Sequence, residues 1–175
     1  MGLIDELDYH PKDPNAVQRS MQRIAGSRPG AWLFSKTLHH VDKPLLRLSR
    51  GRLTVPSLTS GLPVITLTTT GAKTGKRRTM PLVGVPAGDD IAVVGTNFGQ
   101  RSTPAWWFNL RAHPAGEVTY RGRTVAVHAR ETRGKERDAI VDRARGIYSG
   151  YERYEGRISG REIHVMVLQA APADR

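Results

Sequence analysis

The pattern of apolar and polar positions changes character near residue 61. Before that point apolar residues recur at helical spacing, as at Val17, Met21 and Ile24, which predicts amphipathic helices. After it, short β-branched runs alternate with glycine-rich turns, as is typical of antiparallel strands. We therefore expect a helical segment over residues 1–60 packed on a β-rich domain over 61–170, followed by a tail over 171–175.

The β-rich part predicts a series of short strands with two helices between them. Strands are expected at 63–70, 78–86, 91–96, 117–120, 123–131 and 161–169. The helices are expected at 102–114, where Pro104 fits the first turn, and at 134–148. Because strands and helices do not alternate regularly, the pattern favours a small, mostly antiparallel barrel with helices packed outside it.

The charge balance points to an anionic partner. The chain has 27 Lys and Arg against 16 Asp and Glu, a formal net charge of +11. Such a charge suits a nucleic acid, a membrane surface or a polyanionic small molecule. The chain has no cysteine, which excludes disulfides, thiol nucleophiles and cysteine-ligated metals, and fits a reducing cytosol.

One stretch, TTTGAKTGKRRTMPL, concentrates that charge between two predicted strands. It holds Gly71 and Gly75 among four cationic side chains, a composition suited to a phosphate or a carboxylate. The alternative is an exposed hairpin tip with solvated charges. A Walker A loop is excluded, because only three residues separate the glycines and a strand follows.

The sequence contains no motif for a metal site or for a nucleophilic serine. The six histidines do not occur at metal-binding spacings, and no serine lies in a GxSxG motif, so we expect no metal site and no serine nucleophile. An enzyme with this sequence would rely on a cofactor. No run is long and apolar enough to span a membrane, although the basic amphipathic segment around Arg47, Arg50 and Arg52 could rest on an anionic membrane surface or pack on its own domain.

Four motifs in order resemble the deazaflavin-dependent nitroreductase family. They are LTTTGAKTGKRRTMPL, VVGTNFG, PAWWFNLRAHP and YSGYERY, and the resemblance covers Pro63 to Leu168. It implies a split β-barrel of the FMN-binding split-barrel type that binds coenzyme F-420, an 8-hydroxy-5-deazaflavin with a phosphate and an oligoglutamate tail. The implied reaction is hydride transfer to a planar acceptor such as a quinone or nitroaromatic. We expect a cytoplasmic monomer or homodimer, with peripheral contact at the inner face of the membrane as an option.

The resemblance assigns roles by position. For the cofactor it implies contacts at Lys73, Thr74, Lys76, Arg78, Pro81, Gly95, Thr96, Asn97, Trp106 and Asn109. The first four would hold the phosphate and tail, and the others would contact or line the ring site. The predicted catalytic residues are Tyr148, Tyr151 and Tyr154, which match the aromatic segment on the substrate side.

At two positions the sequence departs from the residues common in this family, so ligands other than F-420 stay possible. Ala72 stands where the family commonly has an arginine, and Met80 where it commonly has a polar residue. An FMN-binding or other flavin-like split-barrel protein, as carrier or reductase, is therefore the alternative. A basic nucleic-acid-binding module is a third hypothesis, because cationic residues are interleaved with Trp and Tyr.

Several of the predicted site residues also have packing interpretations. Trp106 and Trp107 face about 100° apart on a helix, so at least one belongs in the core, and we favour Trp107. Asn109 could cap a neighbouring loop. The three tyrosines recur at i+3 spacing, which also describes a packing stripe, although Gly150 and Gly156 nearby favour a mobile lid.

Overall fold

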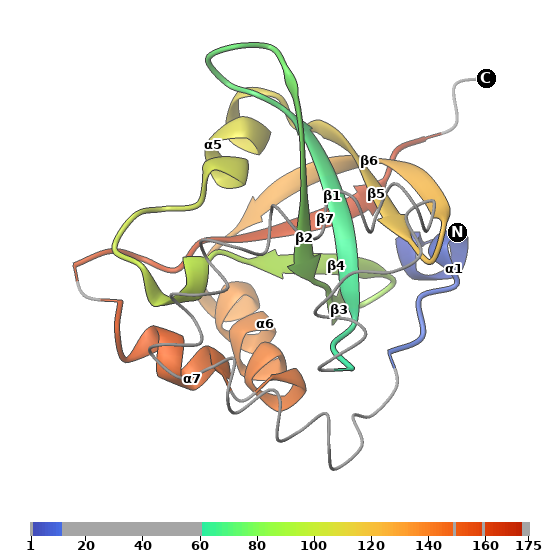
Figure 1. Ribbon diagram of the computed structural model, residues 1–175. Helices are drawn as coiled ribbons and strands as arrows, with labels where there is room; N and C mark the ends of the chain where they lie inside the picture. The colour runs from blue at the N-terminus through green and yellow to red at the C-terminus, as the bar shows by residue number, and fades with distance from the viewer. Residues whose placement is uncertain (1, 12–60, 149, 159, 173–175) are drawn as a thin grey trace.

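The computed structural model describes residues 2–11, 61–148, 150–158 and 160–172 (Figure 1). Seven strands in these ranges form one antiparallel sheet in the order β2-β1-β5-β6-β7-β4-β3. The strands are β1 (Val64–Thr70), β2 (Arg77–Val83), β3 (Val85–Ala87), β4 (Asp90–Val94), β5 (Ala115–Tyr120), β6 (Arg123–Thr132) and β7 (Val165–Ala170). The helices are α1 (Leu3–Leu7), the short 3₁₀ helix η1 (Asn97–Gly99), α5 (Ala105–Ala112), α6 (Gly134–Ile147) and α7 (Gly150–Glu155).

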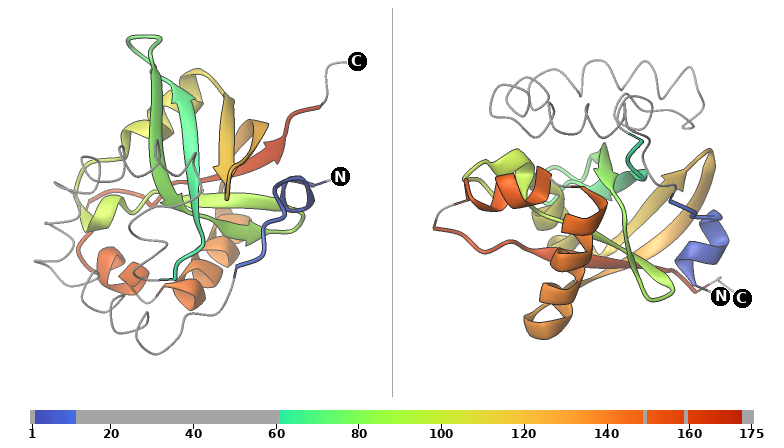
Figure 2. Two further views of the ribbon diagram at one scale, coloured as in Figure 1. Left: turned by 45° about the vertical axis from the view of Figure 1, so that its right-hand side comes forward. Right: turned by 90° about the horizontal axis from the view of Figure 1, so that it is seen from below.

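The sheet is strongly curled. In Figure 1, β1 and β2 run upright while β4 and β7 cross the view, and the helices lie outside the curve (Figures 1 and 2). β7 joins the two halves, because it pairs with β6 on one side and with β4 on the other. The arrangement confirms the predicted split β-barrel of antiparallel strands with flanking helices.

One predicted strand is divided in two. The run expected as a single strand at 78–86 breaks at Gly84, and its halves, β2 and β3, lie at opposite edges of the sheet. A Cβ at Gly84 would lie 2.6 Å from the Tyr9 hydroxyl oxygen, so only glycine fits there. The hydrophobic pattern could not show this break, because apolar residues lie on both sides of Gly84, at 81–83 and at 85–87.

The N-terminal residues contribute the short helix α1, which lies within the segment expected to be helical but ahead of the helical spacing that begins at Val17. Leu3 and Leu7 of α1, together with Tyr9, are at most 1% exposed. The Tyr9 hydroxyl donates to the Gly84 carbonyl oxygen (2.8 Å) and lies 3.2 Å from that of Pro63. The segment thus closes one end of the barrel. The helices predicted from the spacing of Val17, Met21 and Ile24, and the basic segment around Arg50, lie outside the described residues.

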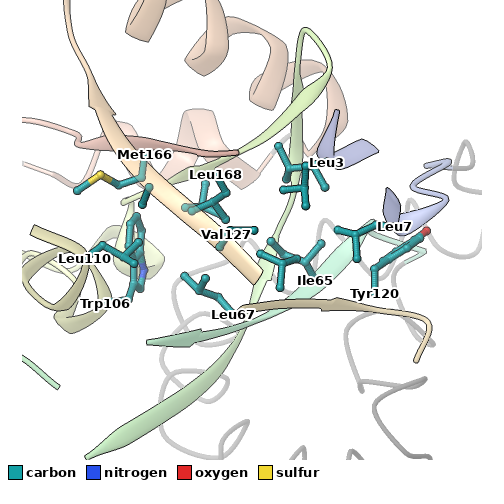
Figure 3. Packing of buried hydrophobic residues seen from close by; sticks show 14 of the residues in the cluster. Leu3, Leu7, Ile65, Leu67, Trp106, Leu110, Tyr120, Val127, Met166 and Leu168 are labelled. Atoms are coloured by element: carbon teal, nitrogen blue, oxygen red, sulfur yellow. The ribbon is translucent and has the colours of Figure 1, made fainter. Parts of the chain in front are cut away.

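The first core lies between the sheet, α1 and α5 (Figure 3). Its members include Leu3, Leu7, Ile65, Leu67, Trp106, Leu110, Val127, Met166 and Leu168. The second core lies between β3, β4 and β7 on one side and α6 and α7 on the other. Its members include Val85, Ala92, Val94, Ile140, Ala144, Tyr148, Tyr151, Tyr154, Val165 and Val167.

Strands β4 and β7 supply side chains to both cores. Ile91 and Val93 of β4 face the first core, while Ala92 and Val94 face the second. Side chains alternate between faces along a strand, so a strand buried on both sides must be apolar throughout. This explains the uninterrupted apolar runs of β4 and β7.

Candidate functional site

The turn between β1 and β2, residues 71–76, is closed by its glycines. The Gly71 amide donates to the Lys76 carbonyl (2.9 Å), and the Gly75 amide donates to the Gly71 carbonyl (2.8 Å). Gly75 has a left-handed backbone (φ +65°), and a Cβ on Gly71 would lie 2.8 Å from the Thr74 hydroxyl oxygen. Both glycines are therefore required for this shape, and the predicted hairpin is confirmed.

Asn109 of α5 holds this turn from the inside. Its side chain is only 7% exposed. Oδ1 accepts a hydrogen bond from the Ala72 amide (3.0 Å), and Nδ2 donates to the Thr69 hydroxyl (3.0 Å). Asn109 therefore caps a neighbouring loop, as one interpretation predicted, and it does so for the turn proposed to bind the cofactor. Its direct contact with the cofactor stays a prediction.

The turn presents its cations to solvent. Lys73, Thr74, Lys76 and Arg78 are all exposed. Arg77 is paired with Glu117 (2.6 Å), but none of the ion pairs among the described residues includes either lysine or Arg78. Uncompensated cations on a rigid turn are suited to a phosphate or a carboxylate.

Arg78 and Pro81 project from opposite faces of β2. Side chains alternate along a strand, and Arg78 shares its face with Met80, which packs on the first core. Pro81 lies on the other face, opposite Thr66 of β1. Because β2 is an edge strand, a ligand lying along that edge can still reach both side chains.

The face with Pro81 forms a row from the turn to the second core. The row runs from Arg77 through Thr79 and Pro81 to Val83, which packs against that core. The hydroxyl groups of Thr79 and Thr68 are hydrogen-bonded across the hairpin (3.1 Å). At about 3.4 Å per residue the row spans about 20 Å. At one end, where Arg77 pairs with Glu117, the row adjoins the cationic turn; it bears hydroxyl groups in the middle and is apolar at the other end.

The segment after β4 has an unusual backbone. Asn97 and Phe98 are left-handed (φ 47° and 55°), which non-glycine residues rarely adopt. The Asn97 side chain donates to the carbonyl and the hydroxyl oxygen of Ser102 (3.0 and 3.1 Å). The Gly95 amide donates to the His164 carbonyl (2.8 Å). This segment contains the predicted ring contacts Gly95, Thr96 and Asn97, which the structure brings together in one loop.

Arg161 holds the same segment and was missed by the sequence analysis. Its guanidinium donates to the backbone carbonyls of Gly95, Thr96 and Gln100 at distances of 3.0 to 3.3 Å. Desolvation lowers the pKa of this guanidinium. The sequence offered no signal, because Arg161 is one of 27 basic residues and belongs to no recognised motif.

The predicted catalytic tyrosines gather in the second core. Tyr148, Tyr151 and Tyr154 are each 5% exposed, and their rings meet edge to face. The hydroxyl groups of Tyr148 and Tyr154 are hydrogen-bonded (3.0 Å). Burial raises the pKa of all three hydroxyls, so they are neutral near neutral pH. The packing interpretation is confirmed, and the catalytic role stays a prediction.

Two contacts link the tyrosines to the rest of the site. Phe98 of the 95–100 segment packs edge to face on Tyr154, with ring centroids 6.1 Å apart. Arg145 of α6 binds the Glu155 carboxylate (2.5 and 3.2 Å), which fixes α7 against α6. The tyrosines and the predicted ring loop are therefore neighbours.

Both tryptophans of α5 are buried. Trp107 donates from Nε1 to the Glu131 carboxylate (3.1 Å) and stacks on His164 (centroids 4.0 Å apart), so its predicted core position is confirmed. Trp106 is 2% exposed and lies beside Leu110 and Met166 in the first core (Figure 3). Its described contacts are core contacts, and its place beside the cofactor stays a prediction.

Two features of the described residues bear on other functions. In those ranges, no group of three or more His, Asp or Glu side chains could hold a metal ion. Likewise, no helix in the described part of the chain is long and apolar enough to cross a membrane.

Known proteins are similar to this chain in sequence and fold. A family model described as F420H(2)-dependent quinone reductase matches residues 44–170. An F420H(2)-dependent quinone reductase of Mycobacterium tuberculosis is 31% identical over 141 residues, which cover 74% of this chain and 92% of that protein. A solved F420-H2 Dependent Reductase is 34% identical with a TM-score of 0.55, over 61% of this chain and 93% of that one. A structure described as a domain-swapped dimer is 28% identical with a TM-score of 0.58, over 80% of this chain and 98% of that one.

Proposed function

Because the chain belongs to the F420H(2)-dependent quinone reductase family, we propose that it transfers a hydride from reduced coenzyme F-420 to a quinone. The observation that carries the proposal is the cationic turn at one end of the β2 row, with the tyrosines at the other end. A phosphate with an oligoglutamate tail is a polyanion, and the deazaflavin ring is flat and largely apolar. The two ends of the row match the two ends of that molecule.

The turn would bind and orient the anionic end. Lys73, Lys76 and Arg78 supply the charge, and Thr74 adds a hydroxyl group. Asn109 is neutral and keeps the turn closed without offering a competing anion. The charges on the turn are therefore left for the ligand.

The other end would place the reacting groups. Reduced F-420, when bound, would supply the hydride, and the quinone would take that hydride and one proton to become a quinol. Pro81 and the 95–97 loop would flank the ring, and the aromatic cluster on α7 would exclude water from it. In the Tyr148–Tyr154 pair either hydroxyl can donate to the other, and with Tyr154 as the donor the Tyr148 proton would be available for a quinone oxygen.

A fluorescence titration of F-420 tests the binding site. The Lys73→Ala/Arg78→Ala variant removes one charge from the turn and one from the start of β2, and we expect its affinity to fall about tenfold or more. The matched control, Lys135→Ala/Arg123→Ala, removes the same net charge from exposed positions elsewhere and should bind normally. Equal weakening in both variants would make the effect one of net charge. No binding of F-420 by the wild type, with binding of FMN in a parallel titration, would replace the proposal by the flavin alternative.

A homodimer is the assembly that we propose. The similar structure described as a domain-swapped dimer supports it, since that chain is matched over 98% of its length. Light scattering coupled to size-exclusion chromatography tests it directly. A mass of about 19.3 kDa would instead indicate a monomer.

A further inference from the structure

The guanidinium of Arg161 is saturated by carbonyl oxygens. Nε donates to the Gln100 carbonyl (3.3 Å), Nη1 to those of Gly95 (3.0 Å) and Glu162 (3.2 Å), and Nη2 to those of Thr96 (3.0 Å) and Gln100 (3.1 Å). A guanidinium has five N–H donors, so these bonds use each of them. None is left for a ligand.

The partners of Arg161 are unusual for an arginine. No ion pair among the described residues includes it, although Glu162 is its neighbour in the chain and pairs instead with Arg137 (2.7 Å). Arginine at an ordinary structural site more often binds a carboxylate. Here the planar fork gathers three carbonyls of one short segment, which is a clamp on backbone conformation.

The 95–100 segment needs such a clamp. Asn97 and Phe98 both have left-handed backbones, which are strained for residues with a Cβ and persist only when surrounding contacts enforce them. The carbonyls held by Arg161 lie on both sides of this pair, at Thr96 and at Gln100. Removing the guanidinium would therefore release the segment on both sides of its strained residues.

The clamp also determines where one amide points. A trans peptide unit directs its C=O and N–H in opposite directions. Because the Thr96 carbonyl faces Arg161, the Asn97 N–H faces away from it, and no hydrogen bond described in the structure uses that N–H as a donor. An amide fixed in this way is prepared to donate to a ligand oxygen or nitrogen.

We propose that Arg161 is a positioning residue that presets the 95–100 segment, and with it the Asn97 amide, for the polar edge of the cofactor ring. The inference rests on the proposed function, because it takes that ring as the ligand. Arg161 itself does not touch the ligand. It acts through the backbone of the residues that do.

The test compares Arg161→Gln and Arg161→Lys with Arg137→Gln. Arg137 is a matched control, since it lies close to Glu162 but binds only the Asp138 and Glu162 carboxylates in the described contacts. We expect Arg161→Gln to weaken F-420 binding about tenfold, raising the KM for the cofactor while the KM for a quinone such as menadione stays unchanged. Lysine has three donors on one atom and cannot span three carbonyls, so it should rescue binding only in part.

Hydrogen exchange supplies the readout that separates positioning from general destabilisation. In Arg161→Gln, amides in the peptide over residues 95–101 should exchange faster, while those of β1 and the 71–76 turn keep wild-type rates. Adding guanidinium ion at millimolar concentration to Arg161→Ala should restore slow exchange and part of the affinity. This second variant keeps the test decisive if Arg161→Gln does not fold.

Normal F-420 binding by Arg161→Gln, with fast exchange confined to the 95–101 peptide, would overturn the proposal, because the segment would then be irrelevant to the cofactor. Uniformly faster exchange across the sheet would overturn it too, since Arg161 would then be a general stabiliser. Failure of the wild type to bind F-420 would instead overturn the proposed function. The exchange comparison would still show whether Arg161 holds the segment.

Discussion

The 71–76 turn and the 95–100 segment are both held by one side chain from elsewhere in the chain, but the two side chains differ in charge. Asn109 holds the turn through one accepted and one donated hydrogen bond, and it is neutral. Arg161 holds the segment through donated bonds alone, and it is a cation. In both cases the charge of the holding side chain complements the charged or polar groups of the loop that it holds.

The difference follows from electrostatics. The turn bears the exposed Lys73 and Lys76 and leads into Arg77 and Arg78 of β2, so a cationic clamp would repel them and an anionic clamp would compete with the ligand. The 95–100 segment presents inward-facing carbonyls and bears no cation of its own, so a guanidinium is the complementary partner. A neutral clamp therefore suits the site for the charged tail, and a cationic clamp suits the loop for the ring.

The largest expected effect comes from removing the neutral clamp. Asn109→Ala leaves the Ala72 amide and the Thr69 hydroxyl without their buried partner, and the free energy of unfolding should fall by about 3 kcal/mol. Urea denaturation measures it. A loss below about 1 kcal/mol would show that the turn closes without Asn109.

A second variant gives the clamp a charge. Asn109→Asp keeps an acceptor for the Ala72 amide but sets a carboxylate under the cationic turn, where it competes with the anionic tail. We expect F-420 to bind about tenfold more weakly, with a smaller deficit at high salt. Titrations at two ionic strengths test this. Unchanged affinity would mean that the charge of the clamp is irrelevant.

The strain in the other loop can be measured with a pair of variants. Phe98→Ala and Phe98→Gly both lose the ring that packs on Tyr154, but only glycine accepts the left-handed backbone without strain. Phe98→Gly should therefore be the more stable of the two by about 1 kcal/mol. Equal stability in thermal and chemical denaturation would show that Arg161 has no strain to hold.

The smallest expected effect is on the pH dependence of the free energy of unfolding. It should involve the 95–100 segment, which lies beside the tyrosines, and not the 71–76 turn. Burial raises the pKa of Tyr148, so this hydroxyl stabilises the fold fully below the pKa of the unfolded state and loses that contribution as pH rises toward the folded value. From pH 8 to pH 10 the wild type should lose about 0.4 kcal/mol more than Tyr148→Phe, because half of the unfolded tyrosine ionises near pH 10.

Hydrogen exchange at both pH values locates this loss. Faster exchange should appear in α7 and the 95–100 segment, which contact each other through Phe98 and Tyr154, and not in the 71–76 turn. Faster exchange in the turn alone would contradict the separation of the two regions.

Local patterns predicted much of the fold. The β-branched runs, the glycine turn and the helices over α5 and α6 were all visible, because each depends on residues close in sequence. The continuous apolar run of β4 also indicated a buried strand. The order of the strands in the sheet was not predicted, because it depends on contacts between distant segments.

The site was predictable only in part, for the same reason. The cations of the turn and the residues of the 95–97 loop could be located from motifs. Arg161 could not, because its role exists only once residues 66 positions apart are brought together. The opposite orientations of Arg78 and Pro81 follow from strand register, which the sequence alone did not provide.

The central position of β7 has a consequence for the order of folding. Among the described strands this one comes last in sequence, yet it joins β4 and β3 to the other four strands. During synthesis the two halves of the sheet emerge before it, and their facing edges stay unpaired until β7 leaves the ribosome. Contacts of such sequence separation form slowly and expose strand edges meanwhile. Premature termination before residue 165 would therefore yield two incomplete half-sheets prone to aggregation, rather than a smaller barrel.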